Sequence, residues 1–428
     1  MRRVVVLSVD AMVFEDTELL RKLPVFSELW DKTARVERVR SIYPTITYPC
    51  HTTMMTGVYP DKHGIISNEQ EIPGDRKPKW THYRKSVTAP TFFDKAKEAG
   101  LTTASVFWPV TGGDPNIDYL INEYWPQTPE CSDADAFRES GTSEEVMERI
   151  VLPNLPVMEG KPRKHPFSDD FIYNCSNDIL RTYKPNLLAI HHASVDHYRH
   201  KSGVFTPLVE HGIHEVDHYM GNLLKAAADA GVLEETDFFV VSDHGQMDIR
   251  RAVAINAIFA EEGLISIGEN GELTDWRAWV KSGGLSALVY VKDPADEKRV
   301  YDILCRLRDD GVYGVSEVFT REEAARDHHL DGKFSFVLET DGMTTFSTEW
   351  ERPLVRPLTN ADYRLGRATH GYLPHKGPQP TLIAFGPHIK PGVVLSDANL
   401  VDEAPTIARV LGLDMGDVEG RVLEEILL

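Results

Sequence analysis

Residues 4–10 read Val-Val-Val-Leu-Ser-Val-Asp, an apolar β-branched run that ends in a carboxylate. Such a run is typical of a buried strand. Similar runs recur farther along the chain at 103–107, 186–190, 237–241 and 380–385. The stretches between them include helix-like segments at 89–100, 168–183 and 209–230. Strands that alternate with helices predict an α/β fold with a mostly parallel sheet.

The pattern changes between residues 250 and 363. Residues 269–272 read Glu-Asn-Gly-Glu, which is typical of a hairpin turn, and 286–292 resemble a strand. Residues 297–310 have the spacing of an amphipathic helix. We therefore expect a smaller α+β cap insertion at 250–363. The catalytic core would comprise residues 1–249 and 364–428.

Charge and apolar content restrict the partners of the chain. Its 428 residues include 66 acidic and 46 basic ones, for a net charge of −20. Such a charge repels nucleic-acid polymers and anionic membranes. No segment reaches the about 18 apolar residues of a membrane span, and the four cysteines form no CxxC pair. We expect a soluble cytoplasmic protein with a small-molecule substrate; the sequence does not specify an oligomeric state.

Acidic and imidazole side chains follow several predicted strands. Ligands of open α/β sheets bind at the carboxyl ends of the strands, which is where these residues lie. Carboxylate oxygen and imidazole nitrogen are ligands that zinc and similar ions accept. Singly, each residue is more typical of a turn or a helix cap. Together they predict sites for two metal ions, with the ligands Asp10, Asp196, His200, Asp243, His244 and His370.

A hydroxyl group stands near a predicted helix start. Thr47 lies between Pro44 and Pro49 in Tyr-Pro-Thr-Ile-Thr-Tyr-Pro-Cys, just before a probable helix. Free N–H groups at a helix N-terminus attract phosphoryl oxygens. The alternative is a plain N-cap threonine. Beside the metal ligands, Thr47 is a candidate nucleophile.

Several motifs together resemble the nucleotide pyrophosphatase/phosphodiesterase family of the alkaline phosphatase superfamily. They are the strand end at Asp10, the turn 44–49, the segment 56–65, the pair Asp196/His200, and the motifs 242–245 and 369–372. The resemblance covers the core and not the insertion. It implies an alkaline-phosphatase-like core of three α/β/α layers around a mostly parallel sheet.

The resemblance also implies roles for these residues. One metal would be held by Asp196, His200 and His370, and the other by Asp10, Asp243, His244 and Thr47. The metals are expected to be two Zn²⁺ ions, with Mn²⁺ as the alternative. The implied activity is that of a phosphodiesterase or nucleotide pyrophosphatase, a phosphoric diester hydrolase acting through a phosphothreonine intermediate on small phosphate esters or nucleotides.

Substrate contacts are sought near the nucleophile. By the resemblance, an asparagine that binds a phosphate oxygen is expected three residues after the nucleophile, where this chain has Cys50. A thiol is a weaker donor than an amide. The aromatic residues Trp80, Tyr83 and Trp108 are further candidates for binding a nucleobase, or they belong to the core.

Two other functions remain open at this point. Related enzymes keep the metal ligands and vary the surrounding residues, so a phosphonoacetate-hydrolase-like enzyme or a phosphomonoesterase is a second hypothesis. A non-enzymatic metal-binding protein is a third. It is disfavoured because a structural zinc site is closed, whereas here a hydroxyl accompanies the ligands.

Overall fold

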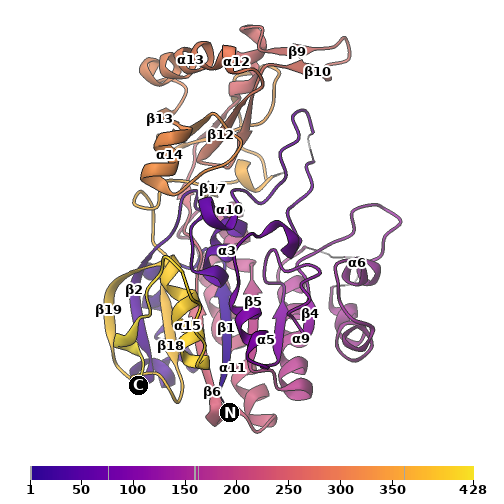
Figure 1. Ribbon diagram of the computed structural model, residues 1–428, viewed down its shortest axis with the longest axis vertical. Helices are drawn as coiled ribbons and strands as arrows, with labels where there is room; N and C mark the ends of the chain where they lie inside the picture. Colours follow the sequence, from indigo (N-terminus) through magenta and orange to yellow (C-terminus); the bar gives the residue numbers. More distant parts are fainter. Residues whose placement is uncertain (1, 76, 159–160, 162, 361) are drawn as a thin grey trace.

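The largest element of the fold is an eight-stranded sheet in the lower half of the molecule (Figure 1). The computed structural model describes residues 2–75, 77–158, 161, 163–360 and 362–428. In spatial order the strands are β19 (Val394–Asn399), β2 (Ala34–Arg40), β18 (Leu382–Phe385), β6 (Thr236–Val241), β1 (Arg3–Val9), β5 (Leu187–His192), β3 (Thr103–Val106) and β4 (Tyr119–Ile121).

Most of these strands run parallel. β1 pairs in parallel with β5 and β6, and β3 pairs in parallel with β5 and β4. β18 is antiparallel to both of its neighbours, β6 and β2. The predicted mostly parallel sheet is confirmed. The five predicted strands correspond to β1, β3, β5, β6 and β18.

Alternating side chains of β1 build two separate cores. Val5, Leu7 and Val9 face one hydrophobic cluster, and Val4 and Val6 face another, as the two-residue period of a strand requires. The first cluster includes residues of α9 (Phe167–Tyr183) and α11 (Pro207–Asp229). The second includes residues of α3 (Thr47–Thr56), α5 (Phe92–Glu98) and α15 (Glu403–Leu411). Helices therefore cover both faces of the sheet, which gives three layers.

The segment 250–363 forms the upper, orange part of Figure 1 and is called the cap below. Its main sheet is antiparallel, in the order β11 (Ala278–Ser282), β12 (Ser286–Val291), β14 (Phe336–Thr340), β13 (Val315–Thr320). The hairpin of β9 (Ile265–Ile267) and β10 (Leu273–Trp276) and the helix α13 (Glu297–Asp310) lie where they were predicted. Trp279, Val289 and Leu304 belong to a third hydrophobic cluster. The cap therefore has a core of its own, and its limits at 250 and 363 stay a prediction.

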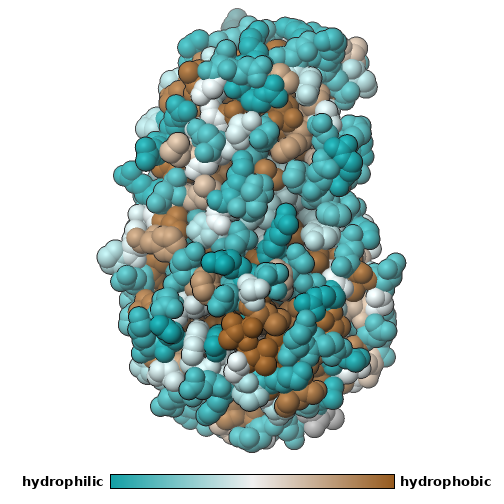
Figure 2. Space-filling model, turned by 90° about the vertical axis from the view of Figure 1, so that its left-hand side faces the viewer, coloured by the Kyte–Doolittle hydropathy of each residue, from teal (hydrophilic) through white to brown (hydrophobic). Residues whose placement is uncertain are grey.

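One edge of the large sheet is open to solvent. Apolar residues gather low on the face shown in Figure 2, the side on which Figure 1 places β19. Val394 at the start of this edge strand is 45% exposed, and Asp397 is exposed as well. A charge on an edge strand opposes pairing with another chain.

Among the described helices, none combines the length and the apolar content needed to cross a membrane.

Candidate active site

The carboxyl ends of three neighbouring strands bring the predicted acidic residues together. Asp10 directly follows β1, and Asp243 comes two residues after the end of β6. Asp196 lies in α10 (Ser194–Ser202), which begins just after β5. Since β1 lies between β5 and β6 and runs parallel to both, the three residues meet at the carboxyl end of the central strands.

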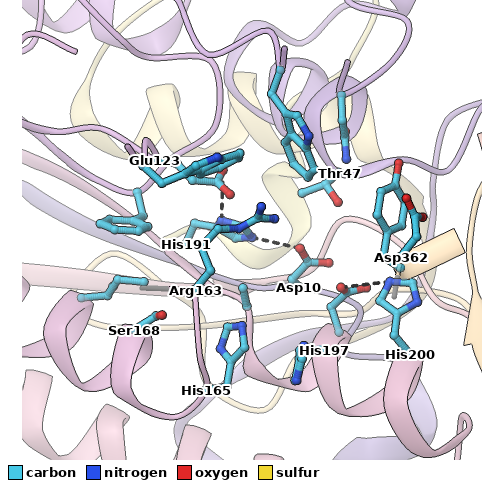
Figure 3. A pocket seen from close by; sticks show the side chains of 18 of the residues that line it. Asp10, Thr47, Glu123, Arg163, His165, Ser168, His191, His197, His200 and Asp362 are labelled. Carbon is cyan, nitrogen blue, oxygen red and sulfur yellow. Dashed lines mark hydrogen bonds and ion pairs between the residues drawn. The ribbon is translucent and has the colours of Figure 1, made fainter. Parts of the chain in front are cut away.

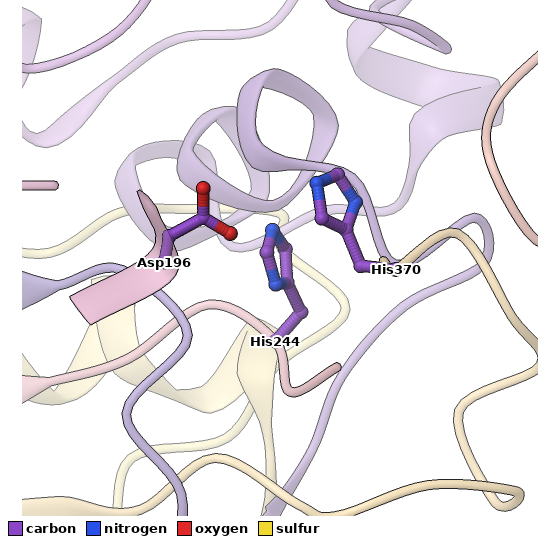
Figure 4. Close-up of side chains that lie close together, drawn as sticks. All are labelled: Asp196, His244 and His370. Carbon is purple, nitrogen blue, oxygen red and sulfur yellow. The ribbon is translucent and has the colours of Figure 1, made fainter. Parts of the chain in front are cut away.

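Two groups of possible metal ligands lie side by side at this end of the strands. Ligand atoms of Asp10, Asp243 and His244 all lie within 4.8 Å of one another. A second group with the same spacing contains Asp196, His244 and His370 (Figure 4). His244 belongs to both groups, and its Nε2 lies 3.2 Å from Asp243 Oδ2 and 3.6 Å from Asp10 Oδ1.

His200 lies at the border of the second group. Its Nε2 is 3.2 Å from Asp196 Oδ2, as the four-residue spacing on α10 predicted. Its Nδ1–H donates to the carbonyl of Ala368 at 2.8 Å, and His370 Nδ1–H donates to the carbonyl of Thr45 at 3.0 Å. A carbonyl can only accept, so these bonds leave the Nε2 lone pair of each ring for another partner.

Thr47 is the first residue of α3, and its side chain lies beside these ligands. Its Oγ1 is 3.3 Å from His244 Nε2. Ile46 is the residue that precedes the helix, and no side chain caps the helix there, so Thr47 is not an N-cap. Pro49 is compatible with the helix because it lies in the first turn, where a missing N–H costs no helical hydrogen bond. The hydroxyl therefore remains available for chemistry.

The carboxyl groups are held close together in a buried place. Burial, and then the charge of Asp243, raise the pKa of Asp10 well above its usual range. The pKa of Asp243 rises to about 8, mainly because of burial and also because of Asp196. Asp196 is partly exposed, and although desolvation opposes the change, the neighbouring His200 lowers its pKa. The charged forms of Asp10 and Asp243 are therefore unfavourable unless a cation binds beside them.

Unpaired buried atoms test whether metal ions fit here. Within the described residues, Asp10 Oδ1, Asp243 Oδ2 and His200 Nε2 are buried without a hydrogen-bond partner. Buried polar atoms are normally paired, so these oxygens and this nitrogen lack the partner that a cation would supply. Carboxylate and imidazole donors also suit zinc and similar divalent ions. The residues fit a metal centre.

Neighbouring histidines hold the centre in place. His51 Nδ1–H donates to the carbonyl of Thr47 at 2.9 Å, and the hydroxyl of Ser8 donates to His51 Nε2 at 2.8 Å. On the other side, His191 Nε2–H donates to Asp10 Oδ2 at 3.0 Å. Such supporting hydrogen bonds orient metal ligands. His191 could not be predicted from the sequence, because nothing in the local pattern distinguishes it from a core histidine.

A pocket of about 720 Å³ opens next to Thr47 (Figure 3). Of the predicted substrate contacts, Trp80 lines it. Tyr83 is not among the lining residues and lies beside Tyr124, with the ring centroids 6.0 Å apart. Aromatic residues from distant segments, Trp125 and Tyr363, line the pocket instead.

Cys50 and Trp108 lie in the core and not in the pocket, which corrects their assignment as substrate contacts. Both side chains are completely buried in the hydrophobic cluster below α3. Cys50 Sγ lies 3.4 Å from Ser41 Oγ, and the Trp108 ring packs on His51 with the centroids 5.0 Å apart. The physical reason is packing: the residues of this cluster enclose both side chains, so neither is open to the pocket.

Asn68 is a pocket residue that the sequence analysis missed. It lines the pocket and is 2% exposed. Its Oδ1 accepts the backbone N–H of Tyr48 at 2.8 Å, so its amide group lies next to the start of α3. The NH₂ group is a donor of the kind that was sought at Cys50. Asn68 comes 21 residues after Thr47, and no pattern in the surrounding sequence indicates that it lies beside the nucleophile candidate.

A third group of possible ligands lies far from the pocket. Asp61, His329 and Glu419 come together at the surface. The ammonium group of Lys62 already pairs with Glu419 at 3.1 Å. We assign this group no function.

Comparisons with known proteins identify the family of the chain. Residues 4–373 match the family model described as type I phosphodiesterase / nucleotide pyrophosphatase. Ectonucleotide pyrophosphatase/phosphodiesterase family member 1 of Rattus norvegicus is 24% identical over 254 residues, 57% of this chain and 24% of that protein. The relative C27A7.3 of Caenorhabditis elegans is 25% identical over 270 residues, 61% of this chain and 31% of that protein. The aligned part is thus less than a third of the length of either relative.

Solved structures share the fold. Murine ectonucleotide pyrophosphatase/phosphodiesterase 5 has a TM-score of 0.68 at 20% identity, with both chains fully covered. An inactive variant of the same murine protein, in complex with AMP, has a TM-score of 0.69 at 20% identity, again with full coverage. Because the family model covers most of the sequence, the chain belongs to the type I phosphodiesterase / nucleotide pyrophosphatase family.

Proposed function

We propose that this chain is a metal-dependent phosphodiesterase that hydrolyses nucleotides and similar small phosphodiesters through a phosphothreonine intermediate. One observation carries the proposal: the Thr47 hydroxyl, at a helix N-terminus, lies 3.3 Å from His244, which is shared by two groups of possible metal ligands. A binding protein has no need of a nucleophile beside its metal ligands. Membership in a phosphodiesterase family supports the same activity.

The metal ligands follow from the two groups. Asp10, Asp243, His244 and the Thr47 oxygen would hold one ion. Asp196, His200 and His370 would hold the other, with His244 close to both. When bound, two Zn²⁺ or Mn²⁺ ions neutralise the phosphate charge and favour the ionised form of hydroxyl and water oxygens.

Thr47 performs the chemistry in two displacements. Its Oγ forms a bond to phosphorus while the bond from phosphorus to the leaving oxygen breaks, and solvent supplies the proton that the leaving group needs. The hydroxyl proton of Thr47 passes to solvent. A water molecule then attacks phosphorus, the bond to Thr47 Oγ breaks, and Thr47 regains a proton.

The surrounding residues bind the phosphate and orient the nucleophile. Backbone N–H groups at the start of α3 and the amide of Asn68 are donors for phosphate oxygens. His51 holds the first turn of α3 through the Thr47 carbonyl. Fixed donors of this kind stabilise the charge that develops during phosphoryl transfer.

The shape of the pocket supports a nucleotide substrate. Its volume of about 720 Å³ is far larger than one phosphate group requires, and Trp80, Trp125 and Tyr363 line it. Stacking a base on an aromatic ring contributes about 1–3 kcal/mol. The murine structural relative was solved with AMP, a ligand of this class.

A Thr47→Ala substitution tests the nucleophile. We expect turnover of bis-p-nitrophenyl phosphate and of the p-nitrophenyl ester of thymidine 5′-monophosphate to fall at least about 1,000-fold, because covalent catalysis is lost. The content of bound Zn²⁺, measured by mass spectrometry, should stay close to that of the wild type. Thr274→Ala, at an exposed position on β10, is the matched control. Full activity of the Thr47 variant would refute the assignment.

Substrate panels and chelation separate the alternatives. Removing metal with a chelator should abolish turnover, and Zn²⁺ or Mn²⁺ should restore it. A clear preference for p-nitrophenyl phosphate or for phosphonoacetate over the diesters would favour the monoesterase or the phosphonate hydrolase instead. Absence of turnover for every substrate would favour a metal-binding protein.

A further inference from the structure

The segment that carries Asn68 lies beside a second segment of the pocket wall. Glu69 and Trp80 form an antiparallel bridge, so residues 68–70 and 79–81 run side by side. These two stretches are called the paired loop below. Asn68, Glu69 and Trp80 all line the pocket. The position of the paired loop therefore fixes both a donor for phosphate and an aromatic ring of the pocket.

Two basic side chains hold Glu69 in place. Arg364 Nη1–H donates to Glu69 Oε2 at 3.0 Å. The ammonium group of Lys281, on the cap strand β11, donates to the backbone carbonyl of Glu69 and lies 3.8 Å from Glu71 Oε2. One basic residue thus binds the side chain of Glu69 and the other binds its backbone. Both contacts restrain the residue that directly follows Asn68.

Further contacts fix the guanidinium group of Arg364. Its Nε–H and Nη2–H donate to Asp362 Oδ1 and Oδ2, at 2.8 Å and 2.7 Å. A bidentate pair of this kind sets the orientation of the guanidinium plane. Its Nη1–H also donates to the carbonyl of Ser282, the last residue of β11, at 3.4 Å. Arg364 therefore connects the paired loop to the same cap strand that carries Lys281.

These contacts are shielded from water. Glu69 and Arg364 are each 8% exposed, and Lys281 is 5% exposed. Burial lowers the pKa of Lys281 to about 8, although the charges of Glu71 and Glu69 oppose this change. Removing one partner of a buried ion pair leaves the other charge uncompensated, whereas exposed pairs contribute little. The restraint on Glu69 is therefore stronger than a surface ion pair would give.

The role proposed for Asn68 requires a fixed position. The backbone N–H of Tyr48 donates to its Oδ1 at 2.8 Å, which ties the amide to the start of α3. A preorganised donor stabilises developing charge without rearrangement, and misplacing a catalytic group by about 1 Å can cost about 100-fold in rate. Neither Lys281 nor Arg364 is among the described residues that line the pocket. Their effect on turnover must therefore pass through the paired loop.

We propose that Lys281 and Arg364 are positioning residues for Asn68, acting through their contacts with Glu69. The inference rests on the function proposed above, in which Asn68 donates to a phosphate oxygen. It adds a role for the cap, since Lys281 belongs to the cap and Arg364 bonds to its strand β11. The cap thus supports phosphoryl transfer by fixing the paired loop, and it does so without contacting the phosphate.

A double-mutant cycle tests this inference. Lys281→Met removes the donor and should lower kcat/KM for the p-nitrophenyl ester of thymidine 5′-monophosphate about 10-fold. In an Asn68→Ala background the same substitution should lower kcat/KM by less than about threefold, because the group that Lys281 positions is already gone. A merely structural role would give the same loss in both backgrounds. Lys298→Met is the matched control, since Lys298 is exposed on α13, and it should leave kcat/KM unchanged.

Arg364 provides a second variant in case Lys281→Met does not fold. Arg364→Gln should also lower kcat/KM less in the Asn68→Ala background than in the wild type. Arg364→Lys keeps the charge and should recover part of the loss, but the bidentate bond to Asp362 is not restored. The content of bound Zn²⁺ should match that of the wild type in every variant. Equal losses in both backgrounds, or no loss in either, would contradict the inference.

Amide hydrogen exchange measures the restraint on the paired loop without turnover. The backbone N–H groups of Gln70 and Thr81 donate across the paired loop, each at 2.8 Å. In Lys281→Met their exchange should be about 10-fold faster than in the wild type and in Lys298→Met. Unchanged exchange would show that Lys281 does not hold the loop, and the inference would be wrong. If the wild type cleaves no diester, the proposed function is wrong, and the exchange rates alone decide whether the cap holds the loop.

Discussion

Glu339 of the cap strand β14 joins the cap to the core at the active site. It is completely buried, and its Oε2 accepts the hydroxyl of Tyr43 at 3.0 Å. Its Oε1 accepts the backbone N–H of Leu373 at 3.1 Å and lies 3.1 Å from Lys376 Nζ. The two core segments that it contacts also carry Thr47, the proposed nucleophile, and His370, a proposed metal ligand. We predict that replacing Glu339 by glutamine changes how stability depends on pH.

The magnitude follows from the environment of this carboxyl group. Burial raises its pKa from 4.5 to about 7, although the charge of Lys376 opposes the rise. Between these values the unfolded chain releases its proton and the folded chain keeps it, so the free energy of unfolding falls as the pH rises. From pH 5 to pH 8 this group should remove about 2.5 kcal/mol of stability. Glutamine cannot ionise, so the variant should lack this loss.

Urea unfolding followed by circular dichroism measures the effect. The free energies of unfolding of the wild type and of Glu339→Gln are compared at pH 5 and pH 8 in the same Zn²⁺-containing buffers. The decrease in the free energy of unfolding from pH 5 to pH 8 should be smaller in the variant by about 2.5 kcal/mol. Glu317→Gln is the control, because Glu317 is exposed on the adjacent strand β13. The free energy of unfolding of this variant should fall between pH 5 and pH 8 by as much as that of the wild type. Equal decreases in the wild type and Glu339→Gln would refute the reasoning.

Three other substitutions test residues whose positions only the structure reveals. Asn68→Ala should lower kcat/KM for the diesters about 10- to 100-fold by removing a phosphate donor, as steady-state kinetics will measure. Cys50→Ala should leave kcat/KM within about threefold, because the thiol lies in the core; a larger loss would return Cys50 to the active site. Asp217 of α11 accepts the N–H of Phe26 at 2.9 Å and caps a short helix. Asp217→Ala should therefore lower the free energy of unfolding by about 1–2 kcal/mol in urea titrations, without changing the content of bound Zn²⁺.

Local sequence patterns were enough to predict the strands and the polar residues that follow them. A buried strand needs a continuous apolar run, so β1, β5 and β6 were recognisable from composition alone. Polar residues that directly follow such runs must lie at the carboxyl ends of the strands, whichever order the strands take in the sheet. Asp10 and Asp243 could therefore be predicted to lie at the same end of the sheet, and the pairing of β1 with β6 brings them together. The start of α3 at Thr47 was also local information, because two prolines surround it.

Which side chains reach the pocket depends on how distant segments of the chain pack together. Cys50 is closer to Thr47 in sequence than Asn68, yet core residues enclose its thiol, whereas a hydrogen bond from the backbone N–H of Tyr48 holds Asn68 at the start of α3. Arg163 and Trp125 meet only because the chain folds them together across 38 positions. Sequence periodicity records which residues are buried along one element. The contacts between distant segments depend on how elements pack, and these contacts shape the part of the site that selects a substrate.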